Sequence, residues 1–219
     1  ASNSPDKLKR FVEKYNVHVY SSYNEVIGDD SVDCVYIPLP PAFHYEWAKK
    51  ALLAGKHVFL EKPSTTSADD TKELVGIAGE KGLVVQENYM FQFHAQLKEI
   101  ENLIASGELG KLRLVRTSFG FPRRAEGDFR YVKELGGGTM MDNGGYTIKL
   151  IDMLLGESMR LVSSQLDYDE KTGIDIFGTA EFVNDDGVIA QAAFGMDCQY
   201  QCSLELWGSR GRLTTGRIY

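Results

Sequence analysis

The sequence predicts an α/β protein in which a doubly wound parallel sheet precedes an α+β domain with a largely antiparallel, open sheet. Two observations predict this fold class. Up to about residue 88, short apolar runs alternate with amphipathic helical patterns in units of roughly 25 residues. After Gly156 the chain carries consecutive strand patterns, two of them joined by the hairpin signal Asn184-Asp185-Asp186-Gly187. We therefore place a domain boundary between residues 1–88 and residues 89–219.

The composition excludes several classes of function. The 219 residues are enough for two hydrophobic cores, and 43% hydrophobic with 25% charged residues is ordinary for a globular protein. A net charge of −7 argues against a nucleic-acid partner, and no apolar run approaches the roughly 20 residues that span a bilayer. Cys34, Cys198 and Cys202 are an odd set without metal-ligand spacing. We expect buried free thiols, a cytoplasmic location and no metal site.

Apolar periodicity and capping residues locate the elements of the first domain. Residues 7–15 carry apolar side chains in an i, i+3, i+4, i+7 stripe, which predicts an amphipathic helix. The other expected elements are strands at 17–20, 32–37, 57–60 and 83–86, and helices at 23–27, 44–54 and 67–79, the last capped by Ser67.

The second domain begins with a helical pattern at residues 96–106 and an alternating strand pattern at 112–120. A polar loop follows, and Gly136-Gly137-Gly138 then leads into a long helical pattern at 140–155. The expected strands after this helix are 160–168, 174–182, 188–196 and 201–207.

The strand at 57–60 ends abruptly in Glu61-Lys62-Pro63. Because Pro63 lacks an N–H, it cannot continue a central ladder, and Glu61 and Lys62 are expected at the carboxyl end of the strand. In open α/β sheets that edge forms the ligand crevice. Lys62 is therefore either a catalytic or binding cation or a solvated strand end.

The long helix places Asp142 and Tyr146 on one face. A buried tyrosine that bonds to Asp142 would explain this pair by structure alone. However, Asn143-Gly144-Gly145 adds glycines that cost about 0.5–1 kcal/mol each inside a helix, which favours a helix that lines a site. A tyrosine beside a lysine is a workable acid for ketone reduction, because the ammonium stabilises the phenolate that forms. Lys62 and Tyr146 are our candidates for such a pair.

A dinucleotide site has to be inferred without its most specific motif, since no G-x-G-x-x-G occurs in the sequence. Pro38-Leu39-Pro40 at a strand end and His44 at the next helix start would flank a nicotinamide and ribose, although His44 also suits an ordinary polar helix start. Ala1-Ser2-Asn3, at the expected end of an earlier strand, offers no acid for a ribose 2′-hydroxyl. With Lys7 it favours a 2′-phosphate, hence NADP(H), with NAD(H) as the alternative. The candidate cofactor-binding residues are Ser2, Asn3, Lys7, Pro38, Leu39, Pro40, His44, Glu61, Lys62 and Asn88.

Several motifs resemble the Gfo/Idh/MocA oxidoreductases, the family of glucose–fructose oxidoreductase and inositol dehydrogenase. They span essentially the whole chain and comprise Val32-Asp33-Cys34-Val35-Tyr36-Ile37, Pro40 with His44, Ala54-Gly55-Lys56-His57-Val58-Phe59-Leu60-Glu61-Lys62-Pro63, Ser106-Gly107-Glu108-Leu109-Gly110-Lys111, residues 136–156 and Leu204-Glu205-Leu206-Trp207-Gly208-Ser209-Arg210-Gly211. The resemblance implies a Rossmann dinucleotide-binding domain at 1–88 and a substrate-binding and oligomerisation domain at 89–219. Against the family pattern the sequence lacks the first strand, glycine loop, first helix and second strand. We therefore expect that an amino-terminal piece and the carboxyl-terminal end are missing from it.

Many members of this family carry Asp-x-x-x-His on the long helix, and here Tyr146 stands at the His position. The sequence thus resembles the Tyr-bearing branch, which includes dihydrodiol and xylose dehydrogenases and sugar-nucleotide 3-ketoreductases. Asn88-Tyr89-Met90-Phe91 and residues 127–131 are similar to the last group. By that resemblance, Lys62 and Tyr146 are the catalytic pair, and Asp142 positions the substrate or the tyrosine.

The resulting interpretation is an NADP(H)-dependent oxidoreductase that reduces a keto group on a nucleotide-linked sugar. Arginines of the polar loop would clamp a diphosphate in bidentate fashion, with a solvated basic loop as the alternative. The candidate substrate-binding residues are Lys62, Arg123, Arg124, Arg130, Asp142, Tyr146 and Asp175. Two other functions stay open: a dehydrogenase of free sugars or trans-dihydrodiols, and a non-catalytic sensor that binds dinucleotide and a partner protein. The resemblance also implies a homo-oligomer, either a dimer or a tetramer.

Overall fold

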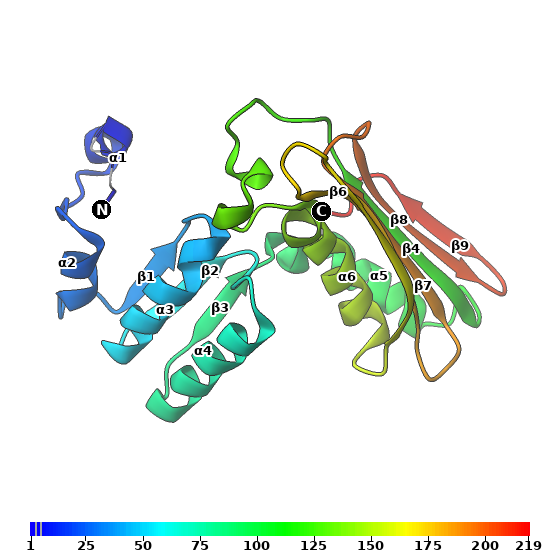
Figure 1. Cartoon of the computed structure of the whole chain (residues 1–219). Helices are drawn as coiled ribbons and strands as arrows, with labels where there is room; N and C mark the ends of the chain where they lie inside the picture. Colours follow the sequence, from blue (N-terminus) through cyan, green and yellow to red (C-terminus); the bar gives the residue numbers. More distant parts are fainter. Residues whose placement is uncertain (3, 5) are drawn as a thin grey trace. The chain divides into compact units, whose positions relative to one another are not determined.

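The structure is a computed structural model that describes residues 1–2, 4 and 6–219. Contacts between Cα atoms divide the chain into two compact units, Ala1–Asn88 and Tyr89–Tyr219 (Figure 1). Each unit has a sheet and a hydrophobic core of its own. No helix among the described residues is long and apolar enough to cross a membrane.

The first unit is built on a parallel sheet with the strand order β1-β2-β3. Its strands are β1 (Cys34–Ile37), β2 (His57–Glu61) and β3 (Val85–Asn88). Val58 of the central strand is aligned with Val35 on one side and Val85 on the other. Such apolar runs are typical of parallel strands covered by helices. The predicted parallel sheet is confirmed.

Two helices, α3 (His44–Leu53) and α4 (Ala68–Lys81), lie next to each other against this sheet (Figure 1). Ser67 caps α4, because its hydroxyl accepts a hydrogen bond from the backbone N–H of Asp70. Gly82 ends α4 in a left-handed conformation, and the N–H of Leu83 donates to the carbonyl of Ala78. This cap explains why β3 begins two residues later than predicted. The core consists of Val35, Ile37, Ala48, Ala51, Leu52, Val58, Leu60, Leu74 and Ala78.

The amino-terminal part differs from the prediction. Helices α1 (Asp6–Tyr15) and α2 (Tyr23–Gly28) form as expected, but the strand predicted at 17–20 is wrong. A strand needs a hydrogen-bonded neighbour, and Val17 and Val19 instead stay largely exposed without one in the described structure. The apolar stripe of α1 is not buried either, since 58% of Phe11 is exposed.

The second unit contains a six-stranded sheet in the order β5-β6-β7-β4-β8-β9. Every neighbouring pair is antiparallel except β4 with β7, which is parallel. The strands are β4 (Leu112–Gly120), β5 (Arg160–Tyr168), β6 (Asp175–Val183), β7 (Ile189–Gly195), β8 (Gln201–Gly208) and β9 (Arg212–Thr215). The predicted open, largely antiparallel sheet is confirmed. The short edge strand β9 was not predicted, because its four residues carry only one apolar side chain.

Two helices, α5 (Ala95–Ala105) and α6 (Gly145–Leu155), cover one face of this sheet (Figure 1). The strands β7 and β8 alternate buried and more exposed residues, as expected for a sheet covered on one face. Short 3₁₀ helices connect the larger elements of the chain at Pro41–Phe43, Met90–Phe93, Phe129–Tyr131 and Lys133–Leu135.

The long helix predicted at 140–155 is interrupted. Its first five residues, Met140–Gly144, form a π-helical turn, and the α-helix α6 starts only at Gly145. Asn143 anchors this turn, because its buried amide donates to the carbonyls of Phe119 and Gly195 at 2.8 Å each. π-Helical turns inside α-helices often occur at functional sites. The sequence signal for this one is the run of glycines.

Candidate active site

The carboxyl ends of β1, β2 and β3 form one edge of the first unit's sheet. Glu61, at the end of the central strand, joins its two neighbours. Its Oε1 accepts hydrogen bonds from the hydroxyl of Tyr36 at 2.6 Å and from the amide of Asn88 at 2.7 Å. Burial, and then the hydrogen bond to Glu61, raise the pKa of Tyr36 to about 12. The structure therefore brings the predicted residues Glu61 and Asn88 together and adds Tyr36, which the sequence analysis missed.

Lys62 and Pro63 follow β2 directly, and the backbone after them is held on two sides. The carbonyl oxygen of Pro63 lies 2.8 Å from Nδ1 of His44, and the N–H of Ser64 donates to Glu87 at 2.7 Å. These contacts fix the loop from which the Lys62 side chain projects.

His44 was predicted to flank a cofactor, and the structure gives it another position. The ring is fully buried, with Nδ1 on the carbonyl oxygen of Pro63 and Nε2 2.7 Å from the carbonyl oxygen of Leu39. A ring with no exposed atom and both nitrogens engaged by the backbone has nothing to present to a ligand. The geometry therefore does not support direct contact between His44 and a cofactor.

A cavity of about 370 Å³ lies at the end of β1 in the first unit. Five of the predicted cofactor-binding residues line it: Ser2, Lys7, Pro38, Leu39 and Pro40. Asn3 lies outside the described residues. Tyr23 and Trp47, whose rings meet edge to face at 5.0 Å, also line the cavity. Nothing in the sequence pattern distinguished these two aromatic residues from core residues.

In the second unit, Tyr146 is the second residue of α6 and is 7% exposed. Its ring is surrounded by other rings, with centroid distances of 5.1 Å to Tyr89, 5.1 Å to Phe119, 5.9 Å to Phe91 and 5.6 Å to Tyr219. Aromatic neighbours at these distances hold a ring in one orientation. We refer to Tyr89, Phe91, Phe119 and Tyr219 as the aromatic cage.

The cage is anchored to the sheet. The hydroxyl of Tyr219 shares a hydrogen bond of 2.5 Å with Thr117 of β4, and burial raises the pKa of Tyr219. Thr117 in turn donates to the carbonyl of Ser203 in β8. The sequence analysis missed the cage, because its rings come from segments far apart in the chain.

Asp142, at the π-helical turn, lies in an ion-pair network. Its carboxylate accepts from Nε of Arg130 at 2.8 Å, and Nη1 of Arg130 also donates to Asp128 at 3.1 Å. Burial by itself would lower the pKa of Arg130, but the charge and hydrogen bond of Asp142 outweigh it and raise that pKa. A guanidinium shared between two carboxylates is poorly placed to clamp a diphosphate, which was one predicted role of Arg130.

Arg123 and Arg124 have a different environment, a hollow of about 650 Å³. Arg123 donates to Asp169 at 2.8 Å, and the guanidinium of Arg124 lies 4.7 Å from the ring centroid of Phe121. Lys171 and Tyr131 line the same hollow. Acidic side chains, Glu126, Asp128, Asp169 and Glu170, line it as well, and its volume is large enough for part of a nucleotide.

Asp175 holds the glycine turn before the π-helical segment. Its Oδ2 accepts from the N–H of Met140 at 2.6 Å, and an added Cβ on Gly138 would lie 2.2 Å from its Oδ1. The close approach requires glycine at 138, where φ is +121°. One oxygen of Asp175 thus accepts from the protein's own backbone and the other packs against Gly138, and the geometry favours a structural role over substrate binding.

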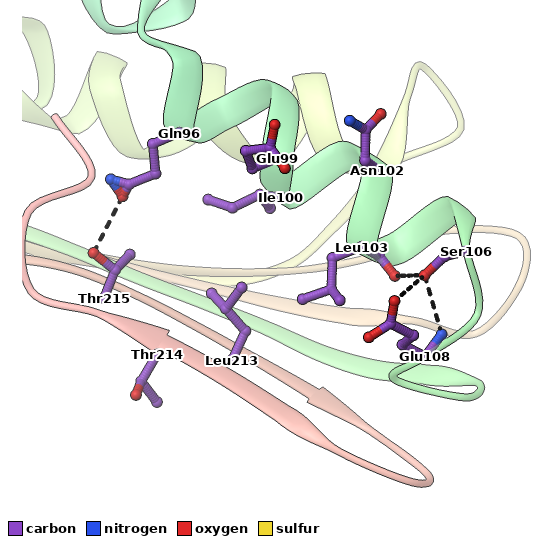
Figure 2. A pocket seen from close by; sticks show the side chains of 10 residues that line it. All are labelled: Gln96, Glu99, Ile100, Asn102, Leu103, Ser106, Glu108, Leu213, Thr214 and Thr215. Atoms are coloured by element: carbon purple, nitrogen blue, oxygen red, sulfur yellow. Dashed lines mark hydrogen bonds between the residues drawn. The ribbon is translucent and has the colours of Figure 1, made fainter.

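A further hollow of about 470 Å³ lies between α5 and β9 (Figure 2). A hydrogen bond of 3.2 Å from Thr215 to Gln96 crosses it. None of the predicted site residues lines this groove. Among the described residues, no group of three or more His, Cys, Asp or Glu side chains could hold a metal ion.

Lys62 and Tyr146 belong to different units, so their pairing stays a prediction.

The comparisons with known proteins cover both units. A family model described as "Oxidoreductase family, NAD-binding Rossmann fold" matches residues 1–89. A second model, described as "GFO/IDH/MocA C-terminal domain", matches residues 97–214.

Three relatives illustrate the match. Over its whole length the chain is 37% identical to a dTDP-3,4-didehydro-2,6-dideoxy-α-D-glucose 3-reductase of Saccharopolyspora spinosa and spans 66% of that protein. A solved structure of a 3-ketoreductase from Actinomadura kijaniata, in complex with NADP and TDP-benzene, has a TM-score of 0.96 and 36% identity, and the match covers 100% of this chain and 67% of that one. The D-xylose 1-dehydrogenase (NADP(+)) 2 of Haloferax volcanii is 34% identical over 81% of this chain and 54% of its own length.

Proposed function

Because this chain belongs to the GFO/IDH/MocA oxidoreductases, we propose that it transfers a hydride from NADPH to a 3-keto group of a nucleotide-linked sugar. The observation that carries the proposal is the match of the whole chain to dTDP-sugar 3-reductases at 36–39% identity. The solved relative with NADP and TDP-benzene supports both the cofactor and the nucleotide part of the substrate.

We assign Lys62 and Tyr146 as the catalytic pair. Solved structures of the Actinomadura kijaniata enzyme include one variant in which a tyrosine is changed to phenylalanine and others in which a lysine is changed to alanine or glutamate. The spacing of those two positions along that chain equals the spacing between Lys62 and Tyr146 here. This equal spacing supports the assignment, and it does so independently of the chemical argument that a lysine and a tyrosine suit ketone reduction.

The chemistry follows from the two side chains. When bound, the nicotinamide supplies the hydride to the carbonyl carbon. The Tyr146 hydroxyl gives its proton to the carbonyl oxygen, on which negative charge develops. The Lys62 ammonium stabilises the phenolate left behind and polarises the carbonyl. Asp142, held by Arg130, orients the substrate or Tyr146.

The cavity at the end of β1 fits part of an NADP(H) molecule. Ser2 and Lys7 offer a hydroxyl and a cation for a 2′-phosphate, and Pro38-Leu39-Pro40 offers an apolar wall for the nicotinamide side. The sequence contains no glycine-rich loop for the pyrophosphate. The role of these residues in binding the 2′-phosphate and the nicotinamide side is part of the proposal.

For the substrate we propose that the hollow around Arg123 and Arg124 takes the nucleoside diphosphate.

We further propose a homo-oligomer that covers the exposed face of the six-stranded sheet. The exposed apolar side chains of Ile189 and Trp207, which lie on that face at one register across β7, β4 and β8, support this. The three free cysteines fit a reducing cytoplasm.

The test is a panel of substrates with NADPH and NADH. We expect oxidation of NADPH with an enzymatically prepared dTDP-3-keto sugar, and a much slower reaction with NADH. Faster oxidation of D-xylose or a trans-dihydrodiol with NADP⁺ would favour the second candidate function, a free-sugar or diol dehydrogenase, which the similarity to the Haloferax volcanii enzyme supports. No turnover with any member of the panel would contradict both.

A further inference from the structure

We propose that His44 is a positioning residue that ties the loop carrying Lys62 to the loop lining the cofactor cavity. The inference rests on the proposed function, in which Lys62 acts on the substrate. In this inference His44 acts by holding two backbone carbonyls in place, and it does not contact a ligand.

The geometry of the two contacts is specific. His44 opens α3, and its ring lies fully buried between the loops that leave β1 and β2. Nε2 lies 2.7 Å from the carbonyl oxygen of Leu39, and Nδ1 lies 2.8 Å from the carbonyl oxygen of Pro63. A single side chain thus bonds to both segments that follow neighbouring strands.

Each partner adjoins one half of the proposed site. Leu39 lines the cavity assigned to the cofactor. Pro63 is bonded directly to Lys62, so the contact to its carbonyl restrains the backbone from which the Lys62 side chain leaves. His44 therefore couples the wall of the cofactor cavity to the placement of the Lys62 ammonium.

The chemistry of the ring strengthens the coupling. Both ring nitrogens lie at hydrogen-bond distance from carbonyl oxygens of two different loops, so one rigid ring spans the gap between those loops. A leucine or phenylalanine would fill the space but has no polar atom to meet either carbonyl.

A positioning role differs from a packing role in a double-mutant cycle. We expect His44→Ala to lower kcat by roughly tenfold to a hundredfold, because a displacement of about 1 Å in a catalytic group has that effect. In a Lys62→Ala background, His44→Ala should change kcat by less than about twofold, because the group that it positions is gone. Losses that multiply in the double variant would overturn the proposal.

Two further measurements do not depend on enzymatic turnover. Reductive methylation gives Lys62 an NMR signal, which His44→Ala should shift or broaden, whether or not any sugar nucleotide is a substrate. Added imidazole should bind the space left in His44→Ala, restore that signal and raise the melting temperature of the variant. If the wild-type protein reduces no keto sugar, the proposed function fails, and the Lys62 signal still decides the role of His44.

His57→Ala serves as the matched control. His57 begins β2, at the end of the strand opposite to Lys62, and its Nδ1 accepts from the N–H of Val84 at 3.0 Å. Losing this hydrogen bond should lower stability and leave both kcat and the Lys62 signal unchanged. An unshifted Lys62 signal in folded His44→Ala, or an equal shift in His57→Ala, would contradict the inference.

Discussion

Tyr146 can serve as an acid only if its ring stays in place while its hydroxyl meets the substrate. The aromatic cage supplies this restraint, with ring centroids 5.1–5.9 Å from that of Tyr146. Aromatic pairs of this kind contribute about 0.5–1.5 kcal/mol each beyond the area that they bury. The orientation of the proposed acid is therefore set by packing within one unit.

At the residue scale, Lys7 should decide between the two nicotinamide cofactors. Lys7→Ala removes the cation that lines the cavity assigned to the 2′-phosphate. We expect the affinity for NADP⁺ to fall about tenfold, the equivalent of one charge-assisted hydrogen bond, and the affinity for NAD⁺ to stay the same. Isothermal titration calorimetry measures both. Lys9→Ala, which removes an exposed lysine paired with Asp6 on the same helix, should change neither, and equal losses for both cofactors in Lys7→Ala would refute the assignment.

Asp169 should make stability depend on pH in the acid range. The hydrogen bond from Arg123, and then those from Thr172, lower the pKa of Asp169 to about 2. An unfolded chain has an aspartate pKa of about 3.9, so the stabilisation is complete above that pH and is lost as the pH falls towards 2. The difference in unfolding free energy between wild type and Asp169→Asn should therefore shrink on acidification. Urea titrations at several pH values test this, with Asp186→Asn in the exposed hairpin turn as the control for the loss of one carboxylate; a constant difference would count against it.

The sequence predicted the positions of several polar residues of the site more successfully than it predicted their roles. Glu61 and Asn88 were placed at a strand edge because parallel strands end together, and the structure joins them by a hydrogen bond. His44 and Asp175 were assigned to ligands, yet their polar atoms meet backbone groups. A sequence pattern indicates the position of a polar residue along a strand or helix. The hydrogen-bond partner of that residue depends on tertiary contacts, which no local pattern encodes.

At the element scale, the start of α6 depends on a close contact with Tyr89. A Cβ added to Gly145 would lie 2.1 Å from the Tyr89 hydroxyl. Gly145→Ala should therefore displace a member of the aromatic cage, cost about 1–3 kcal/mol of stability and lower kcat. The double variant Gly145→Ala with Tyr89→Phe removes the clashing oxygen and should recover most of the stability. Chemical denaturation provides the comparison.

The helix α4 offers a matched control. Gly76 also lies inside a helix, but nothing is within 4 Å of an added Cβ. Gly76→Ala should stabilise the protein by about 0.5–1 kcal/mol, the ordinary gain of alanine over glycine in a helix. If Gly145→Ala behaved in the same way, the proposed contact would not matter.

The elements themselves were predictable wherever a periodic pattern met a capping or turn residue. The strands β4 and β5 have the predicted bounds, and Ser67 caps α4 as expected. The strand expected at 17–20 does not form, and the edge strand β9 and the π-helical turn were missed. Two of these concern pairing between distant segments, and the third depends on a buried Asn143 whose partners are the ends of β4 and β7.

At the scale of the whole molecule, each unit should respond to its own ligand. NADP⁺ at a hundredfold excess over its dissociation constant should stabilise the protein by about 2.7 kcal/mol, because only the folded state binds it. Hydrogen exchange should slow at residues 36–40 in the first unit on addition of NADP⁺, and at residues 123–131 and 169–172 on addition of TDP. The groove between α5 and β9 (Figure 2) serves as an internal reference. Equal slowing there and at the proposed sites would indicate a general effect and contradict these assignments.

The measurement that tests the central claim most directly is the rate of NADPH oxidation with a dTDP-3-keto sugar, by wild type and by Tyr146→Phe. The variant keeps the ring inside the aromatic cage and removes only the proton donor. We expect kcat to fall by about 10²–10⁴-fold with little change in KM, while Tyr168→Phe, which alters an exposed tyrosine of β5, keeps the wild-type rate. Equal rates in wild type and Tyr146→Phe would show that this phenol is not the acid and would contradict the account.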